Sequence, residues 1–358
     1  MIQLQYRPLS LALLLGMGML TLAPMSQAQS NRHTRQQAQA EAPPPAYPNA
    51  TRQEPDAKAT PKMLPKLKAM QESYEHEDWA AVIATADEIG AATTAGAYDK
   101  SFAFTMAGNA ASNLNQPAKA ADYFAKSVAA NGLDNNGHFA TMYNLAVTQF
   151  GEEKYADALA TLDRFLAETR SDKPEHLSLR AGILASMGRN DEAAAAYQAL
   201  LAKNPGDKRL LLNAASALQA AEKYDQANTL LNDAFNRGML TEERELRVLY
   251  VGYLNSEHFD DAKRVIDAGV AKGILKPGPE LGQAYQLLAQ NAYFAEKMPQ
   301  ALDFYTRAAP MMADGEGYLN LAKVLEYVGR KADAKEAARQ ALAKGVKKPE
   351  EANRILSH

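Results

Sequence analysis

The side chains that could bind a metal or act in acid–base catalysis are scattered along this 358-residue sequence. Six histidines are present, and no two stand three or four residues apart, the spacing that would bring their rings to one face of a helix. The run Glu75-His76-Glu77-Asp78 is the densest group of possible ligands for a hard metal ion. We interpret it as a polar turn that caps a helix beginning near Trp79, and we expect no metal site.

Other patterns that carry chemistry are also missing from the sequence. No GxSxG, P-loop or dinucleotide-binding pattern occurs, and no predicted strand precedes Gly315-Glu316-Gly317. The chain has no cysteine, which excludes disulfides, thiolate metal sites and a cysteine nucleophile. Its 39 basic and 42 acidic residues give a net charge of −3, which argues against nucleic-acid binding. We therefore expect a protein that is not an enzyme and that uses no cofactor, metal or nucleic acid.

A three-residue pattern recurs eight times and sets the organisation of the chain. An aromatic or polar residue usually follows a short polar turn, a mostly alanine position comes three residues later, and a mostly apolar position comes four residues after that. The middle residues are 33 to 39 positions apart, near the ~34-residue period of tetratricopeptide repeats. The instances are Trp79-Val82-Ala86, Pro117-Ala120-Phe124, Tyr155-Ala158-Leu162, Asn190-Ala193-Tyr197, Tyr224-Ala227-Leu231, Phe259-Ala262-Ile266, Met298-Ala301-Tyr305 and Lys331-Ala334-Ala338.

The residues that flank this pattern indicate pairs of antiparallel helices. Twelve positions before each middle residue stands a residue that is mostly small, such as Gly108, Ala146 or Ala215, and small residues let two helices approach closely. No strand-like alternation interrupts the helical period. The sequence therefore predicts an all-α fold, a right-handed superhelical solenoid of about eight tetratricopeptide-like helix hairpins. A generic all-helical bundle is the alternative.

The first 28 residues have the features of an export signal. A single charged residue, Arg7, precedes an apolar run from Leu9 to Ala23, and Ser26-Gln27-Ala28 has the small-x-small pattern of a cleavage site. The apolar run is shorter than the ~20 residues that a spanning helix needs, and an uncleaved membrane anchor is the alternative. We expect cleavage after Ala28 and a periplasmic protein that does not span the membrane.

Three further segments follow the signal. Residues 29–62 are rich in proline, glutamine and alanine, so we expect a disordered linker, with a proline-rich docking motif as the alternative. The solenoid is expected over residues 63–345 and a C-terminal capping helix over residues 346–358, where Pro349 and two glutamates mark a helix start.

The first helix of each hairpin should line a concave groove. Counting back 18, 15, 11 and 8 positions from each middle residue selects the side chains that would face it. Amides there could bond an extended peptide backbone, and arginines could pair with carboxylates, although some of these side chains could simply pack on their neighbours. The candidates for protein binding are Asn109, Tyr143, Phe150, Arg209, Arg244, Arg247, Gln286, Gln290 and Tyr293.

Several stretches of the last third are more individual than a generic repeat. They are Arg237–Leu246, Ala268–Pro277, Asp314-Gly315-Glu316 and Ala341–Pro349. Through them the chain resembles, over roughly residues 70–350, the exported tetratricopeptide proteins found with TonB–ExbB–ExbD systems of Gram-negative bacteria.

This resemblance implies a non-catalytic scaffold that supports TonB-dependent outer-membrane transport. Its partners would include TonB, ExbB, ExbD or an outer-membrane receptor. The shared stretches mark fold and lineage, so no site residue transfers with them. A scaffold for cell-envelope biogenesis, in peptidoglycan synthesis, division or outer-membrane assembly, is the alternative, because a fold does not fix a function.

Overall fold

The computed structural model describes residues 45–358, which form helices joined by turns and contain no β-strand. The expected signal peptide and the first part of the expected linker lie outside these residues. No helix in the described range is both long and apolar enough to cross a membrane. The helices are α1 (Leu64–Glu75), α2 (Trp79–Ala91), α3 (Ala97–Asn113), α4 (Pro117–Ala130), α5 (Asn135–Gly151), α6 (Tyr155–Thr169), α7 (Pro174–Ser186), α8 (Asn190–Lys203), α9 (Lys208–Ala220), α10 (Tyr224–Asn236), α11 (Glu243–Asn255), α12 (Phe259–Ala271), α13 (Pro279–Phe294), α14 (Met298–Ala308), the short 3₁₀ helix η1 (Ala309–Met311), α15 (Glu316–Tyr327), α16 (Lys331–Lys344) and α17 (Pro349–Ser357).

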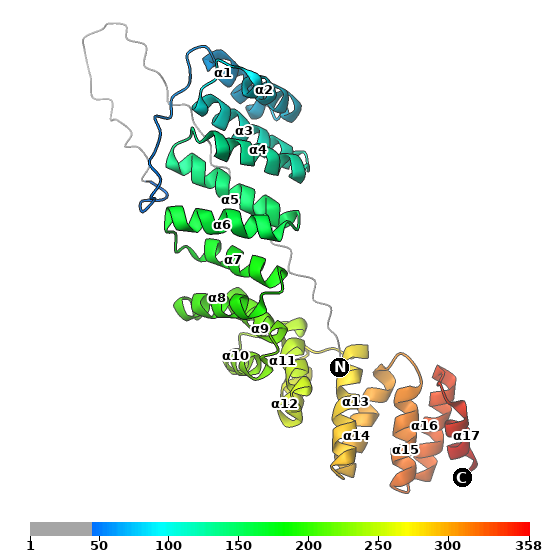
Figure 1. Cartoon of the computed structure of the whole chain (residues 1–358). Coiled ribbons are helices and arrows are strands. Elements are labelled where there is room, and N and C mark those ends of the chain that lie inside the picture. The colour runs from blue at the N-terminus through cyan, green and yellow to red at the C-terminus, as the bar shows by residue number, and fades with distance from the viewer. Residues whose placement is uncertain (1–44) are drawn as a thin grey trace, which may run out of the picture. The chain divides into compact units, whose positions relative to one another are not determined.

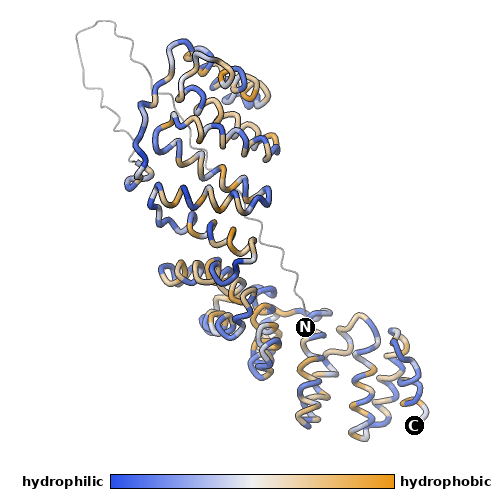
Figure 2. Tube along the Cα trace, viewed as in Figure 1, coloured by the Kyte–Doolittle hydropathy of each residue, from blue (hydrophilic) through white to orange (hydrophobic). Residues whose placement is uncertain are grey.

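The chain divides into two compact units between Ala196 and Tyr197, within α8. The N-terminal unit contains α1 to α7 and the start of α8, and the C-terminal unit contains the rest of α8 and α9 to α17. Within each unit, helices that are neighbours in sequence pack against one another, as α3 does on α4 and α13 on α14 (Figure 1). Figure 2 shows hydrophobic and hydrophilic residues alternating along each helix, as expected for helices with one buried face.

The recurring pattern marks the second helix of every hairpin. The first residues of its eight instances, from Trp79 to Lys331, are the residues at which α2, α4, α6, α8, α10, α12, α14 and α16 begin. The middle residues are buried in all eight instances, and none is more than 1% exposed. The small residues twelve positions earlier, such as Gly108 and Ala146, are buried as well. The predicted all-α fold of eight hairpins is therefore confirmed over the described residues.

The same turn closes each hairpin. The residue two positions before the second helix has a positive φ in every case, and the next N–H donates to the carbonyl five residues earlier, as Asp78 does to Ser73 at 2.9 Å. These are the two marks of a Schellman ending of the first helix. Glycine would be the ordinary choice, since the left-handed conformation costs other residues ~1–2 kcal/mol. The residues at this position are Glu77, Asn115, Glu153, Gly188, Glu222, Glu257, Glu296 and Gly329.

Residues 45–62 differ from the expected disordered linker, and we call them the N-terminal strap. The strap has no helix of its own, yet it runs along one edge of the N-terminal unit (Figure 1). Thr51 donates its backbone N–H to the carbonyl of Glu168 at 2.8 Å, and Arg52 bonds the side chain of Asn135 at 2.7 Å. Two side chains, Tyr47 and Arg52, anchor this otherwise polar segment.

One prediction tests the packing of α6. Ala158 is fully buried, so Ala158→Leu should overpack the interface between hairpins and lower the free energy of unfolding by roughly 1–3 kcal/mol. Ala160 lies on the same helix but is exposed, and Ala160→Leu should change stability by less than about 0.5 kcal/mol. Urea unfolding followed by circular dichroism measures both. Equal midpoints for the two variants would contradict this register.

Candidate protein-binding surface

The three candidates in the N-terminal unit are partly engaged by neighbouring helices. Burial raises the pKa of Tyr74 in α1, and the side chain of Asn109 in α3 partly offsets this effect. The ring of Tyr143 in α5 lies 5.6 Å from that of Phe165 and 4.8 Å from that of His176. Phe150 lies 5.7 Å from Tyr155, measured between ring centroids. All three candidates are half-buried, so packing accounts for much of their surface.

Two arginines in the C-terminal unit are exposed and held in register by their sequence neighbours. Arg209 and Arg244 occupy the first turns of α9 and α11. The preceding Lys208 pairs at 2.7 Å with the buried Glu245, which also accepts the N–H of Glu242 at 3.0 Å and so caps α11. Burial alone would raise the pKa of the Glu245 carboxyl, but Lys208 and the backbone N–H groups outweigh burial and lower it. The pair therefore fixes the helix starts that carry the two arginines.

The remaining arginine and the two glutamines continue this surface across α11 and α13. Arg247 forms an ion pair with Glu280 at the start of α13, and this pair links two successive hairpins. Gln286 and Gln290 are half-buried on α13. The Oε1 atom of Gln286 is buried and has no hydrogen-bond partner in the described part of the chain. A buried amide oxygen without a hydrogen-bond partner is unfavourable, and the same burial keeps this atom out of reach of a bound segment.

Aromatic residues that the sequence analysis missed border this surface. Tyr293, a predicted candidate, lies 5.8 Å from Phe294 and 6.1 Å from Tyr327, measured between ring centroids. Phe294 is 82% exposed and Tyr327 is 67% exposed, the two largest values among the exposed large hydrophobic residues of the described chain. Both stand seven positions before the middle residue of their repeat, where the other six repeats have Glu, Asn, Gly, Ser, Ala and Asn. Comparing this position across the repeats would have found them.

We name the side chains of this region the first-helix surface of the C-terminal unit. It combines cationic, amide and aromatic groups on helices α9, α11, α13 and α15. Aromatic residues and arginine are the types enriched where proteins contact one another. The members are Arg209, Arg244, Arg247, Gln286, Gln290, Tyr293, Phe294 and Tyr327.

Several titratable groups of the described residues have pKa values that burial shifts. Burial lowers the pKa of His138 and of His176 to about 4, and burial raises that of Tyr250 to about 12. No cluster of three possible metal ligands occurs in residues 45–358. Within Glu75-His76-Glu77-Asp78 all four residues are exposed, and Asp78 accepts the N–H of Ala81 at 3.1 Å, as a helix cap does.

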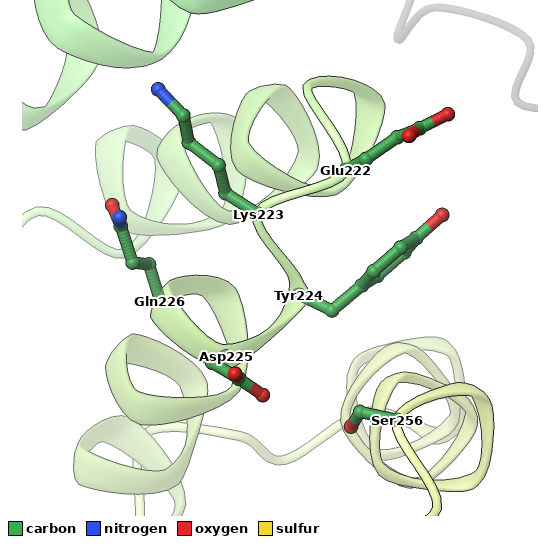
Figure 3. A pocket seen from close by; sticks show the side chains of 6 residues that line it. All are labelled: Glu222, Lys223, Tyr224, Asp225, Gln226 and Ser256. Atoms are coloured by element: carbon green, nitrogen blue, oxygen red, sulfur yellow. The ribbon is translucent and has the colours of Figure 1, made fainter.

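Two shallow depressions in the described residues lie at equivalent turns of the repeat. One, of about 290 Å³, is lined by Glu222 to Gln226 and by Ser256. Figure 3 shows these side chains pointing in different directions rather than toward a common point. The other, of about 400 Å³, is lined by Glu153 to Asp157 and by Met187. Their recurrence at the start of α10 and of α6 makes them a product of the repeat rather than a pocket built for a ligand.

Comparisons with known proteins agree with this architecture. A family model described as the tetratricopeptide repeat matches residues 105–173 and 143–208, and a second model with the same description matches residues 184–238. No curated protein matches the sequence.

Solved structures are similar to this chain at low sequence identity. The C-terminal part of a tetratricopeptide repeat-containing protein from Cytophaga hutchinsonii is 18% identical, with 68% of this chain and 97% of that chain covered and a TM-score of 0.51. A tetratricopeptide repeat protein from Parabacteroides merdae is 16% identical, with coverages of 71% and 96% and a TM-score of 0.43. YrrB, described as a TPR protein with an unusual peptide-binding site, is 23% identical, with coverages of 48% and 84% and a TM-score of 0.39.

Proposed function

Because residues 105–238 carry tetratricopeptide repeats and the same hairpin recurs from α1 to α16, we propose that this protein is a non-catalytic adaptor that binds other proteins. Its main contact region is the first-helix surface of the C-terminal unit. The observation that carries this proposal is the presence, on the first helices of successive hairpins, of two exposed arginines and two exposed aromatic rings.

The chemistry of this surface favours an extended acidic segment with an apolar residue. Arg209 and Arg244 can each form paired N–H to oxygen bonds with a carboxylate. The half-buried amide of Gln290 can hydrogen-bond the backbone of the bound segment, and the rings of Phe294 and Tyr327 can cover an apolar side chain. Arg247 already pairs with Glu280, and Arg244 donates to the carboxylate of Glu242 at 2.9 Å, so a bound carboxylate would compete with Glu242 for Arg244.

The proposed setting is the bacterial periplasm, where the adaptor would support TonB-dependent outer-membrane transport. The export signal expected over residues 1–28 and the sequence resemblance of the last third support this setting. In the structure, three of the resembling stretches contain a basic residue and a positive-φ glycine at or directly after the end of a second helix: Arg237-Gly238, Lys272-Gly273 and Lys344-Gly345. These turns lie between hairpins, and the binding residues must be tested separately.

Charge reversal of the exposed arginines tests the binding surface. Arg209→Glu combined with Arg244→Glu should weaken partner capture at least about tenfold, because two attractive contacts become repulsive. The matched control is Arg330→Glu with Arg339→Glu, the same charge change at exposed residues before and within the second helix α16. Pull-down of partners from cells after crosslinking measures both. Equal capture by the two double variants would remove the arginines from the site.

The same pull-down separates the two settings. Enrichment of TonB, ExbB, ExbD or an outer-membrane receptor that is lost in the Arg209/Arg244 variant supports the transport role. Enrichment of peptidoglycan synthases, division proteins or outer-membrane assembly factors instead would contradict the transport role and support the envelope-biogenesis role.

A further inference from the structure

The N-terminal strap binds the loop edge of its unit, which we define as the loops between hairpins from α2 to α7 together with the helix ends that flank them. Its backbone makes three of the contacts. Ala46 donates its N–H to Asn136 at 2.9 Å, Thr51 to the carbonyl of Glu168 at 2.8 Å, and Thr60 to the carboxylate of Asp99 at 3.0 Å. Such bonds recognise an extended backbone whatever its side chains, as in other modes of peptide recognition.

Tyr47 is the first of two side-chain anchors. Its ring centroid lies 5.4 Å from that of Phe139, 5.6 Å from that of Phe165 and 6.5 Å from that of His176, so α5, α6 and α7 each supply one wall. The ammonium of Lys173 lies 5.5 Å from the centre of the tyrosine ring. This arrangement suits an aromatic residue, because rings pack edge-to-face and a cation covers the π face.

Arg52 is the second anchor, and the α4–α5 loop surrounds it with oxygen acceptors. Its guanidinium donates to the side chains of Asn131 at 2.9 Å and Asn135 at 2.7 Å. It also donates to the backbone carbonyls of Asn131 at 3.2 Å and Leu133 at 3.0 Å. A planar, forked donor fits four acceptors in this way, whereas the single ammonium of lysine would not.

Most of the strap outside these two anchors is exposed. Pro48, Asn49 and Thr51 between the anchors are exposed, as are Gln53 and Glu54 after them. Figure 2 shows this part of the chain as mostly hydrophilic. The helices that carry the loop edge, in contrast, pack against one another through the contacts of the repeat. The strap contributes no helix to the repeat, but its release would uncover the rings of Phe139 and Phe165, which are fully buried beneath Tyr47.

We infer that the loop edge is a second peptide-binding site, separate from the first-helix surface, and that the strap occupies it as a tethered ligand. Its ligand class is an extended protein segment with a tyrosine followed five residues later by an arginine. Since the strap is joined to α1, its effective concentration at the edge is about millimolar, so a free segment competes only weakly until the strap is displaced.

A labelled synthetic peptide of residues 45–58 tests this inference by fluorescence anisotropy. The full-length Tyr47→Ala/Arg52→Ala variant should release its strap and bind the peptide at least about tenfold more tightly than the unaltered protein does. A peptide with the same two alanines should bind neither protein. The inference is overturned if the variant binds no peptide, if the two proteins bind it equally, or if the alanine peptide binds as well as the native one.

Limited trypsin digestion of the unaltered protein gives a second test that does not depend on the variant folding. Arg52 is held by four hydrogen bonds, whereas Lys58 in the same strap has a side chain that is 79% exposed. Cleavage after Lys58 should be at least about tenfold faster than cleavage after Arg52, because a protease needs a freely accessible backbone. Equal cleavage rates would show that the strap is not held at the edge.

Discussion

Replacing Gly132 with alanine is expected to lower the free energy of unfolding of the N-terminal unit by about 3 kcal/mol or more. A Cβ at this position would lie 2.1 Å from the carbonyl carbon and 2.2 Å from the oxygen of Ala97. Both are backbone atoms at the start of α3, so no side-chain rotation relieves the clash. Gly132 also donates its N–H to the hydroxyl of Ser101 at 2.8 Å, a buried bond that any backbone shift would stretch.

Gly151 gives the matched control for this change. It is the last residue of α5, and no atom lies within 4 Å of a Cβ built there. Gly151→Ala should therefore be neutral or stabilise the protein by up to about 1 kcal/mol, because alanine is the better helix former. Urea titration of both variants by circular dichroism compares them directly. A Gly132→Ala midpoint at or above that of Gly151→Ala would contradict the close approach of α3 to the α4–α5 loop.

Acidification is expected to destabilise the N-terminal unit through two buried histidines. His138 and His176 are 1% and 5% exposed, and burial lowers the pKa of each to about 4. The nearby Arg52 also lowers the pKa of His138, and Lys173 that of His176, while Glu168 and Glu175 oppose these effects.

The direction of the effect follows from the lowered pKa values. Below the ordinary histidine pKa of 6.5 the unfolded chain binds protons that the folded unit excludes until about pH 4. The stabilisation is therefore complete above pH 6.5 and is lost as the pH falls toward 4. Each histidine should contribute about 2–3 kcal/mol of this loss.

Unfolding free energies measured at several pH values between 7.5 and 4 test this dependence. The unaltered protein should lose stability steadily below about pH 6.5. The His138→Gln/His176→Gln variant should show a clearly smaller change over the same range, whatever its stability at neutral pH. The same slope for both proteins would mean that other groups cause the acid sensitivity.

The repeat register could be predicted from sequence because alanine recurs at an interval close to that of tetratricopeptide hairpins. Ala120, Ala158 and Ala262 are fully buried, as the pattern requires. The conformation of the turns could not be predicted in the same way. Glutamate occupies a positive-φ position at five of the eight turns, as at Glu153, where its intrinsic preference would not place it. The packing of the two helices in each hairpin imposes that conformation.

The binding surface was predictable only in part. Counting back from the repeat selected Arg209 and Arg244, which are exposed as a contact residue must be. The same counting selected Tyr143, whose ring packs on Phe165 and His176, because spacing shows which face a residue lies on and not what covers it. The strap was missed for a related reason: low hydrophobicity predicts disorder, yet a few well-placed contacts suffice to hold an extended segment.

Site-specific photocrosslinking in living cells tests the central claim that the first-helix surface holds partner proteins. A photoreactive residue would replace Arg209, Arg244 or Gln290 in turn, and Arg330 or Arg339 as controls at exposed residues of the last hairpin. The proposed function predicts adducts with a small, shared set of proteins from the first three positions and few from the controls. Adducts of equal yield and identity from both groups, or from the controls alone, would contradict it.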